Sequence, residues 1–205
     1  MWGIGFLLMK YAGYCFEPFT IAAGRVFVTA ITLGGYCLYK KSFWVPRKKQ
    51  FIPLLVIVIL GFCYPFAMQP FLVNLYGSGY VGMMLAFVPL LTLLIGRIIL
   101  KTKITKRQSI GIMGGLFFTF LLLHASLALE VSYFGFLISL TIPLAYTFSN
   151  VFIKRDFPQL NPVAFTAFSA LLAGFLTLPF AISNYTILNQ AYIYKSLGAI
   201  FVLGV

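Results

Sequence analysis

The stretch QFIPLLVIVILGFCYPFAMQPFLVNLYGSGYVGMMLAFVPLLTLLIG, residues 50–96, contains no charged side chain. It is too long for one membrane crossing, because a helix crosses the hydrocarbon core of a bilayer with about 20 residues. A short polar segment, 74–79, lies near its middle and has the composition of a turn. We therefore predict two transmembrane helices here, near 51–73 and 79–99.

The rest of the chain repeats this pattern of apolar stretches between charged clusters. The 205 residues are 61% hydrophobic and 9% charged, with a mean hydropathy of +1.01. Soluble domains are about 45–50% apolar and about 25% charged, so an ordinary soluble domain is excluded. The apolar runs are continuous, which favours helices over strands. We predict an all-α, polytopic transmembrane bundle of about eight helices, near 1–16, 19–39, 51–73, 79–99, 108–127, 132–153, 162–182 and 192–205.

Positive charge is concentrated in alternate connections of the predicted bundle, and the formal net charge is +12. The basic residues are Lys40, Lys41, Arg47, Lys48 and Lys49 in the second connection, Arg97, Lys101, Lys103, Lys106 and Arg107 around the fourth, and Lys154 and Arg155 in the sixth. An excess of Lys and Arg marks the cytoplasmic side of a membrane protein. We therefore predict a multi-pass protein of the cytoplasmic (inner) membrane with a cytoplasmic N-terminus. This charge is a topology signal, so nucleic acid is not an expected partner.

The chain contains a weak internal repeat. An offset of 144 residues brings Lys10 onto Lys154 and Pro18 onto Pro162. The first copy begins on a helix that runs outward and the second on a helix that runs inward, so the two copies are predicted to be inverted. Inverted repeats with a substrate site between them recur in secondary transporters.

Several motifs resemble one family of transporters. Trp2-Gly3, Lys10, Pro18 and Arg25, spaced as they are, resemble the opening of the EamA-like branch of the drug/metabolite transporter (DMT) superfamily. Further matches are Ser78-Gly79, Val88-Pro89-Leu90-Leu91-Thr92, Ile110-Gly111 and Gly114-Gly115. The resemblance runs through essentially the whole chain.

The resemblance implies ten helices, arranged as two inverted five-helix bundles around a central cavity. Residues 1–127 then form the first five-helix repeat, and 132–205 form a second repeat that stops in its third helix. The implied function is that of a secondary transporter, an exporter (efflux protein) of small metabolites such as amino acids, working by alternating access. The alternative is a truncated, non-transporting membrane subunit or fragment that needs a partner to complete the second bundle.

Chemistry-bearing side chains are scarce in the chain. No pair of carboxylates, no metal-ligand spacing and no serine–histidine arrangement is present, so we expect no enzymatic activity. We likewise expect no cofactor and no metal. The expected partners are a small-molecule substrate and the lipid bilayer, and a second copy of the chain is a candidate for a homodimer.

Two cations lie inside predicted spans. Lys10 and Arg25 are each about seven residues from the turn at Glu17, which places both roughly 10 Å below the outer end of their helices. An ionisable residue at this depth is a functional candidate, because a charge at the bilayer centre costs at least about 2.5–3.5 kcal/mol. We expect one of them, with Lys10 the stronger candidate, to pair with a substrate carboxylate or phosphate. The alternative is a structural role, in which they snorkel outward.

A few polar and aromatic side chains on apolar helices suit a ligand cavity. On the third predicted helix these are Tyr64, Met68 and Gln69, and on the sixth they are Tyr146, Ser149 and Asn150. The predicted substrate-binding residues are Lys10, Tyr64, Gln69, Tyr146 and Asn150. Hydrogen bonding between helices is the alternative role for these side chains.

Four prolines fall inside predicted spans: Pro65, Pro70, Pro89 and Pro143. Each removes one helical hydrogen bond and permits a bend. We predict kinks at these positions, which serve either gating or packing.

The charge pattern generates a topology prediction. In a variant without the three native cysteines, a cysteine introduced at Ser42 should be labelled only from the cytoplasmic side, and one at Asn184 only from outside. Membrane-impermeant maleimide labelling of intact and permeabilised cells measures this. Labelling at position 42 from outside intact cells would overturn the orientation and the inverted-repeat argument together.

Overall fold

The computed structural model describes residues 2–42, 44–101, 105–125, 131–183 and 188–204. Within these residues the chain forms eight helical segments, as predicted. They are α1 (Trp2–Ala12), α2 (Pro18–Tyr39), a continuous segment of η1 (Lys48–Gln50), α3 (Phe51–Val58), η2 (Ile59–Cys63) and α4 (Tyr64–Tyr76), a segment of α5 (Ser78–Leu85) and α6 (Phe87–Leu100), α7 (Lys106–Ala125), α8 (Tyr133–Asp156), α9 (Pro162–Ser183), and α10 (Ile193–Gly204), which follows η4 (Gln190–Tyr192). The predicted repeat end at residue 127, Lys103 and Asn184 lie outside the described residues.

Of the eight helical segments, which were predicted as transmembrane helices, five have the length and composition of membrane spans. Five of those searched within the described residues are long and apolar enough to cross a bilayer: 18–39, 48–76, 78–100, 133–156 and 162–183. The outward surfaces of the helical segments are also apolar. On α7, for example, the exposed side chains include Ile110, Met113, Phe117, Phe118 and Phe120. A surface of this kind is stable only in contact with lipid or protein.

The predicted helix at 79–99 is divided in the structure. It breaks at Ala86, between α5 and α6, and the Ala86 N–H bonds to the carbonyl of Met83, three residues back, at 3.0 Å. Pro89 explains the break, because it has no N–H to donate to the carbonyl of Leu85. The kink predicted at Pro89 therefore takes the form of a break one turn earlier.

The helix at 48–76 contains a π-helical turn, η2, just before Pro65. Pro65 cannot donate to the carbonyl of Gly61, and the N–H of Tyr64 reaches back five residues to the carbonyl of Ile59. Single π turns of this kind change the direction in which the following side chains point. This turn sets the rotation of α4 about its axis, and the buried residue Gln69 lies on α4.

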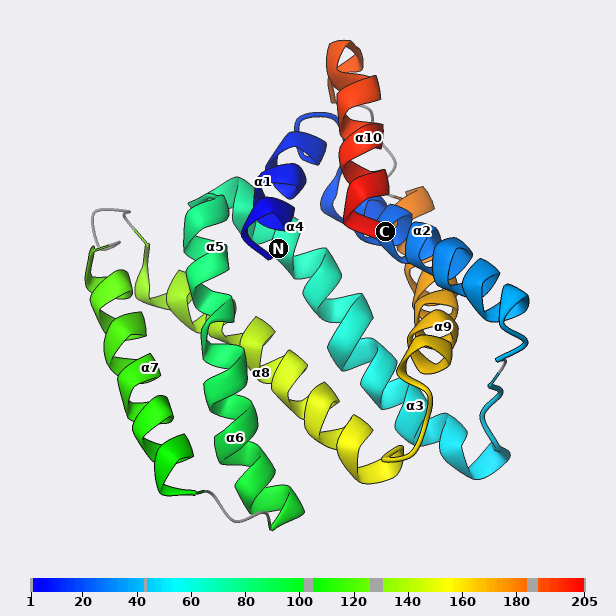
Figure 1. The fold of residues 1–205 in the computed structure, drawn as a ribbon. Coiled ribbons are helices and arrows are strands. Elements are labelled where there is room, and N and C mark those ends of the chain that lie inside the picture. Colours follow the sequence, from blue (N-terminus) through cyan, green and yellow to red (C-terminus); the bar gives the residue numbers. More distant parts are fainter. Residues whose placement is uncertain (1, 43, 102–104, 126–130, 184–187, 205) are drawn as a thin grey trace.

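The helices of the bundle pack in two groups, one around α2 and one around α8. α2 packs most extensively against α9, and α10 lies across α1 and α2 (Figure 1). α8 packs against α3, η2, α4 and α6, and α7 covers α5 and α6. Ser149 donates to the carbonyl of Ile57 at 3.2 Å and ties α8 to α3. Gln69 on α4 and Ser149 on α8 are both buried inside the bundle.

Positive charge gathers at one end of the bundle. The starts of α3 and α7 and the ends of α6 and α8 lie along the lower edge of Figure 1. Basic residues within or beside these helix ends are Arg47, Lys48, Lys49, Lys101, Lys106, Arg107, Lys154 and Arg155. Trp44 lies at this end as well, with its ring against Phe157, Phe165 and Phe168. We call this the basic end; the opposite end carries Glu17.

Gly204 marks the closest approach of α10 to α2. A Cβ added there would lie 2.7 Å from Cγ1 of Val28 and 2.8 Å from the backbone oxygen of Arg25. Thr29 also donates to the carbonyl of Gly204 at 2.8 Å. Gly198, on the same helix, has nothing within 4 Å of its added Cβ.

We expect Gly204→Ala to destabilise the protein by about 1–3 kcal/mol, because the backbone of α2 cannot yield to a new methyl group without a shift. Gly198→Ala should leave stability unchanged or raise it slightly. The midpoint of thermal aggregation of the detergent-solubilised protein measures both variants. Equal loss in the two variants would contradict the packing described here.

Candidate substrate site

Arg25 is the centre of a polar cluster inside the bundle. It lies on the face of α2 that also carries Ile21, Ala22 and Val26, all fully buried. The guanidinium carbon is 4.1 Å from the centroid of the Phe66 ring on α4, a cation–π contact. The helical period therefore turns this cation toward the protein interior rather than toward lipid.

Gln69 connects Arg25 to Tyr146. Nη1 of Arg25 donates to Oε1 of Gln69 at 3.5 Å, and Nε2 of Gln69 donates to the hydroxyl of Tyr146 at 2.8 Å. Gln69 is 1% exposed, so both ends of its amide are satisfied inside the protein. The resulting chain of side chains runs from α2 through α4 to α8.

The positive charge of Arg25 has no anionic partner in the described part of the chain. Its other recorded hydrogen bond runs from Nη1 to the sulfur of Met9, at 3.9 Å. Nε is buried and has no hydrogen-bond partner. The salt bridge recorded among the described residues joins Arg155 to Asp156 at the basic end. A buried charge without a counter-ion is expensive, which marks the cluster as a functional site.

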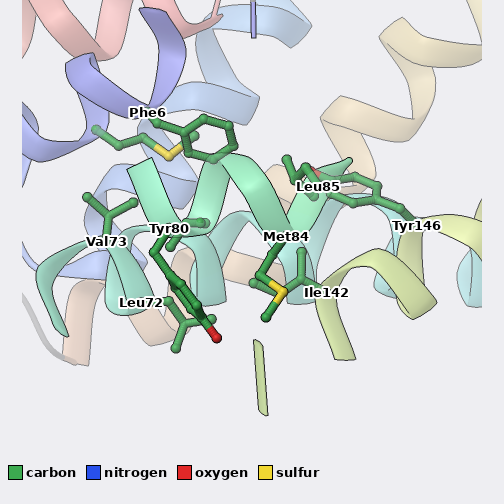
Figure 2. Close-up of a cluster of buried hydrophobic side chains, with 10 residues drawn as sticks. Phe6, Leu72, Val73, Tyr80, Met84, Leu85, Ile142 and Tyr146 are labelled. Atoms are coloured by element: carbon green, nitrogen blue, oxygen red, sulfur yellow. The ribbon is translucent and has the colours of Figure 1, made fainter. Parts of the chain in front are cut away.

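An apolar cluster surrounds one side of this polar chain. Figure 2 shows Phe6, Leu85, Ile142 and Tyr146 among its members, which come from α1, α4, α5 and α8. Tyr146 belongs to both groups, because its ring packs among apolar side chains while its hydroxyl accepts from Gln69. A mostly apolar lining with a few aimed polar groups is typical of small-molecule sites.

The structure brings two of the five predicted site residues together, Gln69 and Tyr146. Tyr64 forms a hydrogen bond with Thr141, also between α4 and α8, but five residues from Gln69 along its helix. Lys10 and Asn150 are exposed side chains of α1 and α8. No contact between either of them and Arg25 is recorded for the described residues. Their role in binding stays a prediction.

The sequence favoured Lys10 over Arg25 as the functional cation and placed both at a similar depth, whereas in the structure Lys10 is exposed and Arg25 is the more buried of the two. On α1 the buried face carries Phe6 and Met9, whereas Lys10 is exposed, as is Leu7 three positions before it. On α2 the residues three and four positions before Arg25 are buried. In the sequence the neighbours of both cations at these spacings are apolar, so the inward orientation of Arg25 becomes visible only once the helices are packed.

The described residues offer no obvious place for a metal. No group of three or more histidine, cysteine, aspartate or glutamate side chains gathers among them. The chemistry of the cluster is instead hydrogen bonding and charge: one guanidinium, one carboxamide and one phenol. Such a set can bind and orient an anionic or polar ligand, and it contains no nucleophile activated by a base.

Comparison with known proteins shows the family of the chain. The model of the EamA-like transporter family matches residues 1–124, more than half of the chain. The chain therefore belongs to the EamA-like transporter family. It is a multi-pass membrane protein of a transporter family, not an enzyme.

Two curated relatives are similar over most of the chain. One, described as an uncharacterized transporter in the trpA 3' region of Buchnera aphidicola subsp. Schlechtendalia chinensis, is 24% identical over 191 residues, covering 89% of this chain and 60% of that protein. The other, described as a probable amino-acid metabolite efflux pump of Salmonella typhimurium strain LT2, is 23% identical over 205 residues, covering 96% of this chain and 64% of that protein. The chain thus spans about three fifths of the length of these relatives. No solved structure matches it significantly.

The role of Tyr146 in the cluster can be tested by removing its hydroxyl. Tyr146→Phe leaves a buried N–H of Gln69 without an acceptor, so we expect a loss of about 1–3 kcal/mol in stability. Tyr194→Phe is the matched control, because Tyr194 is 87% exposed on α10. Thermal aggregation midpoints of the purified variants measure the difference. A Tyr146→Phe variant as stable as Tyr194→Phe would show that the bond contributes nothing.

Proposed function

We propose that this protein is a secondary transporter that exports small metabolites, amino acids among them, across the cytoplasmic membrane by alternating access. The observation that carries the proposal is the buried chain Arg25–Gln69–Tyr146, which joins α2, α4 and α8 inside an apolar bundle. A polar cluster in such a place is costly and suits a ligand that crosses the membrane through the bundle. The Salmonella relative, described as a probable amino-acid metabolite efflux pump, supports amino acids as the substrate class.

An inverted repeat is part of the proposal, and the helix boundaries support it. The offset of 144 residues carries Pro18 onto Pro162 and Tyr39 onto Ser183, which are the bounds of α2 and α9. Both helices therefore have 22 residues and begin with the matched proline. The same offset sets α1 against the second half of α8, and α10 against the first half of the 48–76 helix.

The packing of the helices also supports the repeat. The repeat makes α1 equivalent to α8, α2 to α9, and α3 to α10. A contact between two helices should then recur between their equivalents, so the contact of α1 with α10 corresponds to that of α8 with α3. Likewise, the contact of α2 with α10 corresponds to that of α9 with α3. All four contacts occur, and α2 with α9 maps onto itself. A pseudo-twofold axis between α2 and α9 accounts for this pattern.

Under this proposal the first repeat is residues 1–127 and the second begins at 132. Gln69 then belongs to one repeat and Tyr146 to the other, so their hydrogen bond spans the surfaces that would separate in alternating access. The basic end lies in the cytoplasm, by the positive-inside rule. The proposed substrate-binding residues are Lys10, Tyr64, Gln69, Tyr146 and Asn150. Association with a second copy of the chain stays a prediction.

Transport measurements test the proposal. Cells that produce the protein as its native gene encodes it should lose preloaded amino acids several-fold faster than cells that carry the empty vector. Gln69→Ala and Asn150→Ala should change the rate or the substrate preference at equal membrane abundance. Gln108→Ala, an exposed glutamine at the start of α7, is the matched control and should transport like the parent.

Two outcomes would contradict parts of this proposal. If neither Gln69→Ala nor Asn150→Ala alters transport, the assignment of the binding residues is wrong. If no amino acid leaves the cells faster, the proposed export function fails. Export that appears only after a further membrane protein is supplied would favour the alternative, a non-transporting subunit that needs a partner to complete the second bundle.

A further inference from the structure

We propose that Arg25 binds a carboxylate group of the transported metabolite through the edge of its guanidinium formed by Nε and Nη2. This inference rests on the proposed function and narrows its substrate class to carboxylate-bearing metabolites. It also assigns the anion to Arg25, and not to Lys10.

The first argument is the unused edge of the guanidinium. Both recorded hydrogen bonds of Arg25 leave from Nη1, and both are long, at 3.5 Å and 3.9 Å. Nε is buried without an acceptor among the described residues. A buried donor without a partner costs about 1–3 kcal/mol, so the free form of the site is poorly satisfied. A ligand that supplies acceptors to this edge would recover that cost.

The second argument is that the same edge holds a carboxylate elsewhere in this protein. Nε of Arg155 donates to Oδ1 of Asp156 at 2.7 Å, and Nη2 donates to Oδ2 at 2.9 Å. This two-bond geometry matches the spacing of the two oxygens of a carboxylate. Arg25 presents the same two donors, but here no carboxylate of the described residues lies within reach.

The third argument concerns orientation and charge. The guanidinium carbon lies over the Phe66 ring, and Oε1 of Gln69 accepts from Nη1, so two residues of α4 contact the guanidinium and orient its free edge. A pre-oriented fork loses less entropy on binding than a flexible lysine. Arg25 carries a single positive charge, which one carboxylate neutralises. A phosphate dianion would leave an uncompensated negative charge among apolar helices, so the site favours the carboxylate.

Ligand-dependent thermal stabilisation of the purified protein tests this binding. The probes are the twenty proteinogenic L-amino acids, the carboxamide of the best-binding one, and inorganic phosphate. For the parent we expect the amino acid to bind at least about tenfold more tightly than its carboxamide, which differs only at the carboxylate. This comparison needs no variant and therefore does not depend on how a variant folds.

Variants of the protein then show which side chain produces the preference for the amino acid over its carboxamide. Arg25→Gln should bind the amino acid and its carboxamide equally, at least about tenfold more weakly than the parent binds the amino acid. Arg25→Lys should keep part of the preference, because it retains the charge but loses the fork. Arg97→Gln removes an exposed arginine of α6 and is the matched control, which should keep the full preference of the parent.

Three results would overturn the proposal while leaving export intact. They are equal binding of the amino acid and its carboxamide by the parent, undiminished preference in Arg25→Gln, and stabilisation by phosphate but by no amino acid. Loss of the preference in Lys10→Met, with Arg25→Gln unchanged, would assign the carboxylate to Lys10. Failure of export itself is measured separately, by the cell assay above, and would instead remove the function on which this inference rests.

Discussion

The guanidinium of Arg25, which has no carboxylate partner in the described part of the chain, lies among side chains of α1 and α4 and is linked through Gln69 to α8. A charge cannot be left among apolar side chains without compensation, so its surroundings supply what a neutral protein can. Gln69 offers a carbonyl oxygen, Phe66 the face of its ring and Met9 a weak acceptor. These contacts join two helices, α1 and α4, to α2, and Gln69 extends the network to Tyr146 on α8. They compensate the charge only in part, and an incompletely satisfied cation is what a binding site for an anion requires.

Prolines shape the helices that carry these groups. In lipid each backbone N–H and carbonyl must find a partner within the protein, so a proline forces a local rearrangement. Before Pro65 the chain responds with a π turn, and before Pro89 with a break at Ala86. The π turn ends at Cys63, three positions before Phe66, so it sets the direction in which Phe66 and Gln69 face. The irregularity at one of the four predicted prolines, Pro65, thus contributes to the geometry of the site.

Composition and the spacing of charged clusters were sufficient to predict the eight helical segments, because a bilayer permits few alternatives to a helix. The start of α2 at Pro18 and of α9 at Pro162 was visible in the internal offset. The site was only partly predictable. Gln69 and Tyr146 were identified as polar residues on apolar helices, but a bond between residues 77 positions apart depends on packing that no local pattern encodes. Lys10 and Arg25 had equal depth in sequence, and only the buried faces of α1 and α2 separate them.

In the proposed repeat, the position equivalent to Arg25 is occupied by a neutral residue. The offset of 144 residues carries Arg25 onto Ser169 on α9, a fully buried serine whose hydroxyl has no hydrogen-bond partner among the described residues. Two inverted copies with a cation in each would place two like charges near one axis, and their repulsion in a medium of low dielectric constant would be severe. A neutral residue in one copy avoids this and leaves a single positive charge for the ligand. The proposed symmetry of the two repeats is therefore compatible with an asymmetric site, in which one repeat supplies the charge and the other supplies the hydroxyl of Tyr146.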